Sequence, residues 1–317
     1  MWIGVVYALA AGLMWGLIFL LPQLLHDYPP ALLSAGRYLA FGLIALPLAL
    51  IDRRGLAKLN RADWLQAVRL SAVGNLLYFL CLAGAIQRAG GPLPTMIIGT
   101  LPVVIAITAN LRGNRRDGRL PWRQLAPSLL LIGAGIACVN QTELNALRAT
   151  DIDRMRYASG ALLALGAVVC WTWYPLRNAD WLRHHPDRSP RAWATAQGVA
   201  VLPLSLVAYV LTAAVLHRVE PAFALPFGAR PSLFIGLMVA AGLLASWLGT
   251  LCWNEASQRL PPALAGQLIV FETLAALGYA FALRGSWPAP LTLAGIALLM
   301  AGVLWAARIK PENPAGG

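Results

Sequence analysis

The sequence predicts an all-α membrane protein of ten transmembrane helices, arranged as two inverted five-helix repeats. Three observations support this fold class. Of the 317 residues, 59% are hydrophobic and only 12% are charged, whereas soluble chains carry about 25% charged residues. The apolar residues form long runs, close to the roughly 20 residues that cross a hydrocarbon core as a helix. The two halves of the chain also share residues at fixed offsets.

The predicted spans follow the apolar runs in order. The first two are clear because residues 2–22 and 32–51 form continuous apolar stretches. The later runs are separated by short loops, so successive helices are expected to be antiparallel neighbours. Segments of alternating hydrophobicity, which are typical of barrel strands, do not occur. The predicted spans cover residues 2–22, 31–51, 64–87, 92–111, 122–140, 157–179, 191–217, 231–255, 262–284 and 288–308.

Prolines inside four of these spans predict local kinks, because proline removes a backbone hydrogen bond and crowds the preceding turn. These residues are Pro47, Pro102, Pro175 and Pro203.

The distribution of basic residues predicts the topology. The net charge of +12 is spread over short loops rather than gathered in one patch, so nucleic acid is not an expected partner. The positive-inside rule instead places the more basic loops in the cytoplasm. One set of loops with the C-terminus holds Arg53, Arg54, Lys58, Arg61, Arg112, Arg115, Arg116, Arg119, Arg123, Arg177, Arg183, Arg188, Arg191, Arg259, Arg308 and Lys310. The opposite set holds Arg88, Arg148, Arg154, Arg156, Arg218, Arg230 and Arg284. Both termini are therefore expected in the cytoplasm, with the chain in a bacterial inner membrane.

The sequence offers little for an enzyme. It contains no phosphate-binding glycine loop with lysine, no His-Glu-x-x-His helix and no Gly-x-Ser-x-Gly elbow. The four cysteines lack metal-ligand spacing and fall within apolar spans, so they are expected to be small core residues. We expect no catalytic residues, no metal and no cofactor. Any driving force must then come from a substrate gradient or a coupled ion.

The internal repeat divides the chain into residues 1–148 and 149–317. Trp15 and Gly42 recur as Trp171 and Gly198 at an offset of 156, and further matches in spans 3 and 8 occur at an offset of 171. Because each repeat has an odd number of spans, the second one crosses the membrane in the opposite direction. Inverted repeats are typical of transporters that alternate access to a site near the midplane. Duplicated bundles also serve as scaffolds, so a membrane scaffold that transports nothing is an alternative.

Residues 9–16, residues 256–303 and the five-plus-five pattern of spans resemble the drug/metabolite transporter superfamily. The resemblance is nearest to its EamA-like branch, and within it to aromatic amino acid exporters of the YddG type. It implies export of small molecules through a cavity lined by spans 1, 3, 4, 6, 8 and 9. Two positions differ. Members often have Glu-Pro in span 9, where this chain has Glu272 and Thr273, and Gly-Glu before span 10, where it has Arg284, Gly285 and Ser286.

Charged residues inside the spans need a role, because a charge at the bilayer centre costs at least ~2.5–3.5 kcal/mol on insertion scales. Glu272 lies ten residues after Pro262, close to the midplane. It is a candidate for proton coupling or for binding a substrate ammonium; a structural carboxyl, neutral or hydrogen-bonded, is the alternative. Arg37 is a candidate partner of a substrate carboxylate, although a structural bond to carbonyl groups is favoured. Arg69 and Glu255 lie near span ends, where their side chains can reach the interface.

Three aromatic residues are expected at similar depth, namely Trp15, Tyr78 and Trp171. Their π faces can hold an aromatic ring or a cation, and packing within the bundle is the alternative. Asn75 and Thr100 are candidate hydrogen-bond partners of a polar substrate, or else interhelical contacts. Tryptophans at span ends are expected in the interfacial belt. These are Trp2, Trp64, Trp122, Trp181, Trp287 and Trp305.

These features predict a secondary transporter that exports small amphipathic metabolites, foremost aromatic amino acids. Other amino acids, nucleosides or aromatic cations are alternative substrates, and an intramembrane enzyme is a more distant alternative. The expected partners are a small-molecule substrate, the lipid bilayer and, if Glu272 titrates, a coupled proton. We expect a monomer or a weak homo-oligomer.

Overall fold

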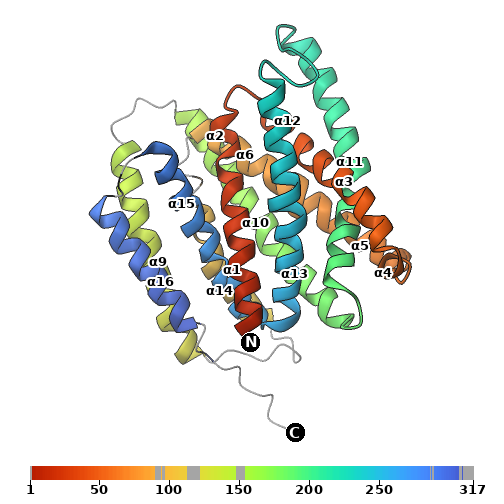
Figure 1. The fold of residues 1–317 in the computed structure, drawn as a ribbon. Helices are drawn as coiled ribbons and strands as arrows, with labels where there is room; N and C mark the ends of the chain where they lie inside the picture. Colours follow the sequence, from red (N-terminus) through yellow and green to blue (C-terminus); the bar gives the residue numbers. More distant parts are fainter. Residues whose placement is uncertain are drawn as a thin grey trace.

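The structure is a computed structural model that describes residues 2–89, 94, 97–112, 122–147, 154–285, 287, 289–306 and 309. Within these ranges, every regular element is a helix, and the helices form one bundle (Figure 1). The start of α1 and the end of α16 lie at the same end of this bundle.

Helices occupy the described part of every predicted span. In the first half they are α1 (Trp2–Gly16), η1 (Leu17–Phe19), α2 (Leu21–Leu24), α3 (Pro30–Ile51), α4 (Arg53–Leu56), α5 (Arg61–Leu70), η2 (Ser71–Leu77), α6 (Tyr78–Ala89), α8 (Leu101–Arg112) and α9 (Trp122–Leu147). In the second half they are α10 (Arg154–His184), α11 (Pro190–Val219), α12 (Pro231–Ala240), η3 (Ala241–Leu248), α13 (Gly249–Arg259), α14 (Pro262–Leu268), α15 (Val270–Arg284) and α16 (Pro290–Ala306). The predicted boundary between residues 148 and 149 lies outside the described residues.

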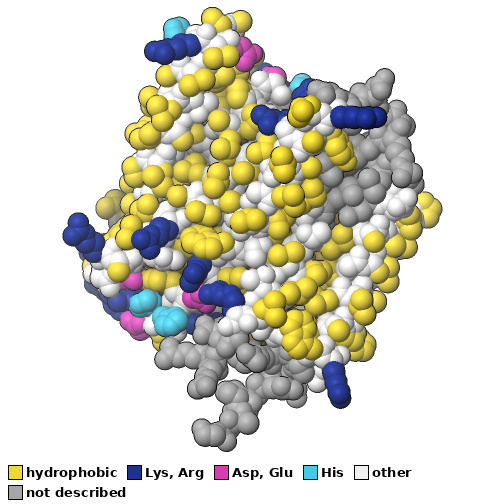
Figure 2. Space-filling view, turned by 180° about the vertical axis from the view of Figure 1, so that it is seen from behind, with side chains coloured by type: hydrophobic (Ala, Val, Ile, Leu, Met, Phe, Trp, Pro, Cys, Tyr) yellow, Lys and Arg dark blue, Asp and Glu magenta, His cyan; other side chains and the backbone are white. Residues whose placement is uncertain are grey.

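Six helical segments of the described chain are long and apolar enough to cross a membrane. They are Trp2–Leu24, Pro30–Ile51, Arg61–Ala89, Arg154–His184, Pro190–Val219 and Pro231–Arg259. Shorter apolar helices cover Leu101–Arg112, Leu264–Tyr279 and Pro290–Gly302. On the face seen in Figure 2, hydrophobic side chains cover the middle and charged side chains lie toward the two ends, as expected for a protein surrounded by lipid.

Several helices begin at residues that suit the first turn of a helix. Proline occupies a first position of α3, α11, α12 and α14, where its missing N–H costs no helical hydrogen bond. A reciprocal capping box between Asn60 and Asp63 starts α5, because each side chain accepts from the other residue's backbone N–H.

Of the four prolines that predicted kinks, Pro102 lies at a break, because α8 begins at Leu101 after a turn at residues 99–100. The other three do not interrupt their helices. Helices α3, α10 and α11 continue through Pro47, Pro175 and Pro203. The middle of two long helices is instead π-helical, at η2 and η3, and neither segment contains proline. A π-helical turn widens the backbone and alters which carbonyl groups are hydrogen-bonded, and such turns are frequent at functional sites. The starts of η2 and η3 are 170 residues apart, close to the 171-residue offset of the repeat in this region.

The helix packing is reciprocal between the two halves. Helix α3 packs on α11, α9 on α16 and α8 on α14, while α1 packs on α13 in the same way as α10 packs on α6. Glycines on both helices allow the close approach of α3 and α11. A Cβ on Gly198 would lie 2.6 Å from the Ala45 Cβ atom, and one on Gly42 would lie 2.7 Å from the Leu202 Cβ atom. These distances are too short for a Cβ atom, so the backbone at each glycine lies directly against residues of the other helix, mainly their side chains.

Candidate functional site

A cluster of aromatic rings lies where α1, α6, α10 and α13 meet. The Trp171 ring stacks on Tyr78, with centroids 4.5 Å apart and an angle of 18° between planes. It stacks on Tyr174 at 5.1 Å. The Trp15 ring meets Trp171 edge-on, with centroids 4.9 Å apart. It is tilted by 48° against the Trp253 ring, with centroids 5.3 Å apart. The structure therefore brings together the three aromatic residues that the sequence singled out, and it adds two that the sequence analysis missed.

Trp15 and Trp171, which the sequence predicts to be equivalent positions of the two repeats, differ in hydrogen bonding. The Trp15 indole donates to the Ala245 carbonyl at 2.9 Å, within the π-helical segment η3. The Trp171 indole N–H is buried without an acceptor. Unpaired buried donors are rare in native proteins, since each costs about 1–3 kcal/mol. Trp15 is therefore anchored to the bundle, whereas the Trp171 N–H has no bond of normal geometry and lies within reach of the Glu272 carboxyl.

Glu272 is buried beside this cluster, with 2% of its surface exposed. Neither carboxyl oxygen accepts a hydrogen bond of normal geometry from the described chain. The Trp171 indole N–H nevertheless lies within reach of the carboxyl, and Arg37 is near enough to act on it electrostatically. Gly12 brings α1 against this point of α15, because a Cβ there would lie 3.0 Å from the Glu272 backbone nitrogen. An unpaired carboxyl in this environment is costly, and it is the strongest acceptor available in the cluster.

Arg37 supplies a donor from α3. Its Nε atom donates to the Ser246 hydroxyl at 3.1 Å, which ties α3 to η3. Its guanidinium also lies over the rings of Tyr38 and Phe79, at 4.8 Å and 4.7 Å from the centroids. One terminal guanidinium nitrogen is buried without an acceptor. Arg37 thus links two helices through a hydroxyl and not through the carbonyl groups expected from the sequence, and one terminal nitrogen keeps its N–H groups unpaired.

The two predicted hydrogen-bonding residues have different environments. Asn75 lies in η2 at 6% exposure, and its side-chain nitrogen has no acceptor. The Tyr78 hydroxyl, one helical turn later, is also unpaired. Thr100 precedes α8 and donates to the Ile97 carbonyl at 2.7 Å. Its hydroxyl is therefore used locally, and within the described chain no hydrogen bond joins it to the cluster.

We name the central cluster by its members: Trp15, Arg37, Asn75, Tyr78, Trp171, Tyr174, Trp253 and Glu272. It combines flat aromatic faces, an unpaired carboxyl and several unpaired donors in one buried region. The rings contact one another, so a ligand would have to separate them. Such a set can hold a small molecule that has an aromatic plate and carries both charges.

Tyr174 and Trp253 were missed for different reasons. Tyr174 follows Trp171 by one helical turn and could have been found from that spacing, since residues three apart share a helix face. Its hydroxyl donates to Gln197 Oε1 at 3.0 Å, so it also supports α11. Trp253 is near the end of a span, where sequence alone favours the interfacial belt.

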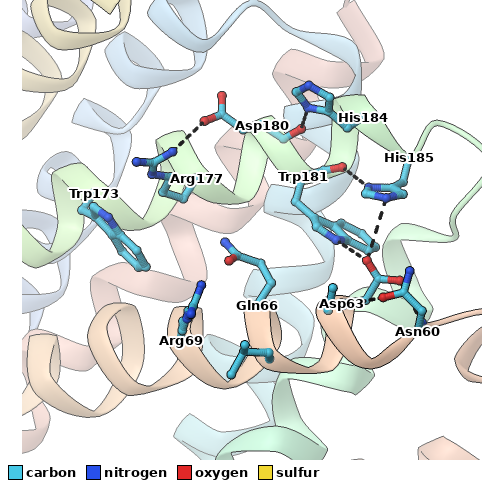
Figure 3. A pocket seen from close by; sticks show the side chains of 12 residues that line it. Asn60, Asp63, Gln66, Arg69, Trp173, Arg177, Asp180, Trp181, His184 and His185 are labelled. Atoms are coloured by element: carbon cyan, nitrogen blue, oxygen red, sulfur yellow. Dashed lines mark hydrogen bonds and ion pairs between the residues drawn. The ribbon is translucent and has the colours of Figure 1, made fainter.

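A pocket of about 650 Å³ opens between α5 and the C-terminal half of α10 (Figure 3). Trp181 lies in its wall at 7% exposure, stacked on Trp193 at 3.5 Å and donating to Asp63 at 2.9 Å. The prediction that Trp181 belongs to the interfacial belt is therefore wrong. The end of a helix also has a face that packs on its neighbours, and position along the chain does not reveal which face a side chain takes.

The comparisons with known proteins agree with this architecture. Residues 2–141 match the EamA-like transporter family. The chain is 58% identical over 311 residues to "Inner membrane protein YtfF" of Escherichia coli (strain K12), which covers 98% of this chain and 97% of that protein. A solved structure described as "Crystal structure of protein" is similar with a TM-score of 0.70 and 17% identity, over 96% of each chain. That likeness concerns the fold alone.

The family match and the extensive identity to the curated relative, together with the apolar helical bundle, identify the chain. It belongs to the EamA-like transporter family and is a membrane transporter.

Proposed function

We propose that the protein exports small amphipathic metabolites, foremost aromatic amino acids, from the cytoplasm across the bacterial inner membrane. The observation that carries this proposal is the combination of unpaired groups in the central cluster. Glu272 offers two unbonded carboxyl oxygens, and Arg37 offers an unbonded guanidinium nitrogen. A free amino acid has an ammonium group for the first and a carboxylate for the second. Charge-assisted hydrogen bonds of this kind are about twice as strong as neutral ones.

The aromatic part of the substrate has its own partners. Tyr78, Trp171 and Tyr174 form a stack, and a substrate ring can be inserted beside or within it. Each aromatic pair adds roughly 0.5–1.5 kcal/mol beyond the area buried, up to about tenfold in affinity. Aliphatic amino acids, nucleosides and aromatic cations would each miss part of this set. We therefore expect a broad specificity with an aromatic preference.

We further propose that transport uses alternating access between two inverted repeats, residues 1–148 and 149–317. The reciprocal packing of the two halves supports this arrangement. The close contact between α9 and α16 also supports it. A Cβ on Gly135 would lie 2.8 Å from the Leu299 Cγ atom, and one on Gly302 would lie 2.7 Å from the Ile132 Cγ1 atom. The paired π-helical segments η2 and η3 flank the central cluster from opposite repeats. They are the places where each repeat can bend around the substrate.

Glu272 is the residue that we propose for coupling to protons. When no ammonium group is bound, deep burial without hydrogen bonds favours the protonated, neutral form of this carboxyl. Protonation can then substitute for the substrate charge, so that one of the two is bound in each conformation.

Purified protein in liposomes tests the proposal. Counterflow of labelled phenylalanine, tryptophan, threonine, uridine and an aromatic cation should be measured with and without a pH gradient. We expect the aromatic amino acids to exchange fastest. Exchange of uridine or the cation alone would replace the proposed substrate class, and exchange of none would favour a scaffold.

A further inference from the structure

The pocket between α5 and α10 has two carboxylates, and both are already engaged. Asp63 accepts hydrogen bonds from the Trp181 indole and from the Asn60 backbone, each at 2.9 Å. Asp180 accepts from Arg112 at 2.6 Å. Arg112 therefore compensates the charge of Asp180. Asp63 is only 3% exposed, and both its carboxylate oxygens are held by N–H donors of the wall.

The basic groups of this pocket are not engaged to the same extent. In the part of the chain that the structure describes, Arg69 and Gln66 make no hydrogen bond or ion pair through their side chains. Arg177 reaches Asp180 only at 4.0 Å, and its side chain is 53% exposed. The available charge of the pocket is thus positive.

The pocket also contains an aromatic side chain. Trp173 projects from α10 into the pocket, and Gln66 and Arg69 project toward it from α5 (Figure 3). The volume of about 650 Å³ lies within the roughly 300–1,000 Å³ of small-molecule sites. From the sequence, the Arg69 side chain is expected to reach the interface from a span end. The sequence does not show that Trp173 and Arg177 line the same pocket.

We infer that this pocket is a second binding site, which takes the carboxylate of a small aromatic molecule. Arg69 and Arg177 hold the carboxylate, Gln66 donates a hydrogen bond to it, and Trp173 packs on the ring. This inference deepens the proposed function, since the site would load the same class of substrate. Unlike the central cluster, it has no free carboxyl for an ammonium group, so aromatic acids without an amino group bind there as well as amino acids do.

The position of the pocket suits a loading site. Arg69 precedes Asn75 by six residues along α5 and η2, which corresponds to about 9 Å along a helix. Trp173 follows Trp171 by two residues on α10. Two residues correspond to about 3 Å along the helix, so a molecule held by Arg69 and Trp173 is less than about two helical turns from the central cluster.

The test measures occupancy of the pocket without requiring transport. Ala62, an exposed residue of the pocket wall, is replaced by cysteine in the full chain in phosphatidylcholine nanodiscs. The rate of maleimide labelling at position 62 is followed by peptide mass spectrometry. 3-Phenylpropionate is the probe, and 2-phenylethylamine is its counterpart without a carboxylate. Arg69→Gln tests the site, and Arg61→Gln on the same helix is the matched control.

We expect 3-phenylpropionate to slow labelling and the amine to have no effect. Arg69→Gln should raise the half-protecting concentration about tenfold or more, the size expected for loss of a charged hydrogen bond, while Arg61→Gln and Trp171→Ala leave it unchanged. Equal protection by the amine, no protection by either probe, or loss of protection in Trp171→Ala with retention in Arg69→Gln would each overturn the inference.

Anionic lipid is the other source of a negative group at this position. A second set of nanodiscs containing phosphatidylglycerol distinguishes it. If the lipid alone slows labelling at position 62, and Arg69→Gln abolishes that effect, the pocket holds a lipid headgroup and the inference is wrong. A failure of aromatic amino acid transport in liposomes would contradict the proposed function and leave this result unaffected.

Discussion

The indole rings of Trp15 and Trp171 meet edge-on with their centroids 4.9 Å apart, although 156 residues separate them along the chain. Only the first of them uses its N–H, in a bond to the Ala245 carbonyl. Trp15 thus fixes one side of the central cluster, and Trp171 provides the face and the donor that remain available.

Replacing Trp171 should reduce the transport of aromatic substrates more than the transport of aliphatic ones. In Trp171→Ala, the substrate ring loses its main stacking partner, so phenylalanine transport should fall about tenfold relative to threonine transport. Trp171→Phe keeps a ring and should recover most of that difference. Both are measured as kcat/KM in liposomes.

Trp2→Ala is the control for that comparison, because Trp2 is 69% exposed at the start of α1. It should leave the ratio of phenylalanine to threonine transport unchanged. An equal loss of both substrates in Trp171→Ala would assign this ring to packing.

Glu272→Gln should abolish the dependence of transport on a pH gradient. The amide cannot bind and release a proton, whereas its size allows the bundle to fold. Counterflow of phenylalanine at several internal pH values measures the effect. Glu255→Gln is the matched control, since Glu255 is paired with Arg259 at the end of α13.

Persistence of pH dependence in Glu272→Gln would mean that this carboxyl is structural. A wild-type protein without pH dependence would instead indicate a facilitator that follows the substrate gradient.

Arg37→Met should raise the KM for phenylalanine about tenfold or more, because a charged hydrogen bond to the carboxylate contributes about 1.5–3 kcal/mol. Arg37→Lys keeps the charge and should lie between wild type and Arg37→Met. The exposed Arg218→Met, on α11, provides a control. If Arg37→Met lowers stability and leaves KM unchanged, the bond to Ser246 is its whole contribution.

Gly198→Ala should destabilise the protein by about 1–3 kcal/mol, as overpacking of a close contact does. The added Cβ would lie 2.6 Å from the Ala45 Cβ atom, so α3 and α11 must move apart. Gly236→Ala is a matched control within α12, because nothing lies within 4 Å of its added Cβ. Thermal unfolding in detergent compares the two. Equal midpoints would show that α3 and α11 separate at little cost.

Hydrophobic runs predicted the helices well, because a segment that crosses lipid must be long and apolar. They could not predict η2 and η3, which contain no proline and depend on contacts between distant segments. The depth of Trp15, Tyr78 and Trp171 could be estimated from span ends, yet the face that each ring takes could not. The pocket around Arg69 and Trp173 was missed for the same reason.

The most direct test of the central claim is whether the wild-type protein requires both charges and the ring of its substrate. Counterflow of phenylalanine, 3-phenylpropionate, 2-phenylethylamine and threonine is compared in liposomes, after subtraction of the rates in protein-free vesicles. If the central cluster binds an aromatic zwitterion, phenylalanine should have a kcat/KM about tenfold or more above each of the other three. Equal rates for phenylalanine and either single-charge analogue would contradict the pairing of Glu272 and Arg37 with the two ends of the substrate.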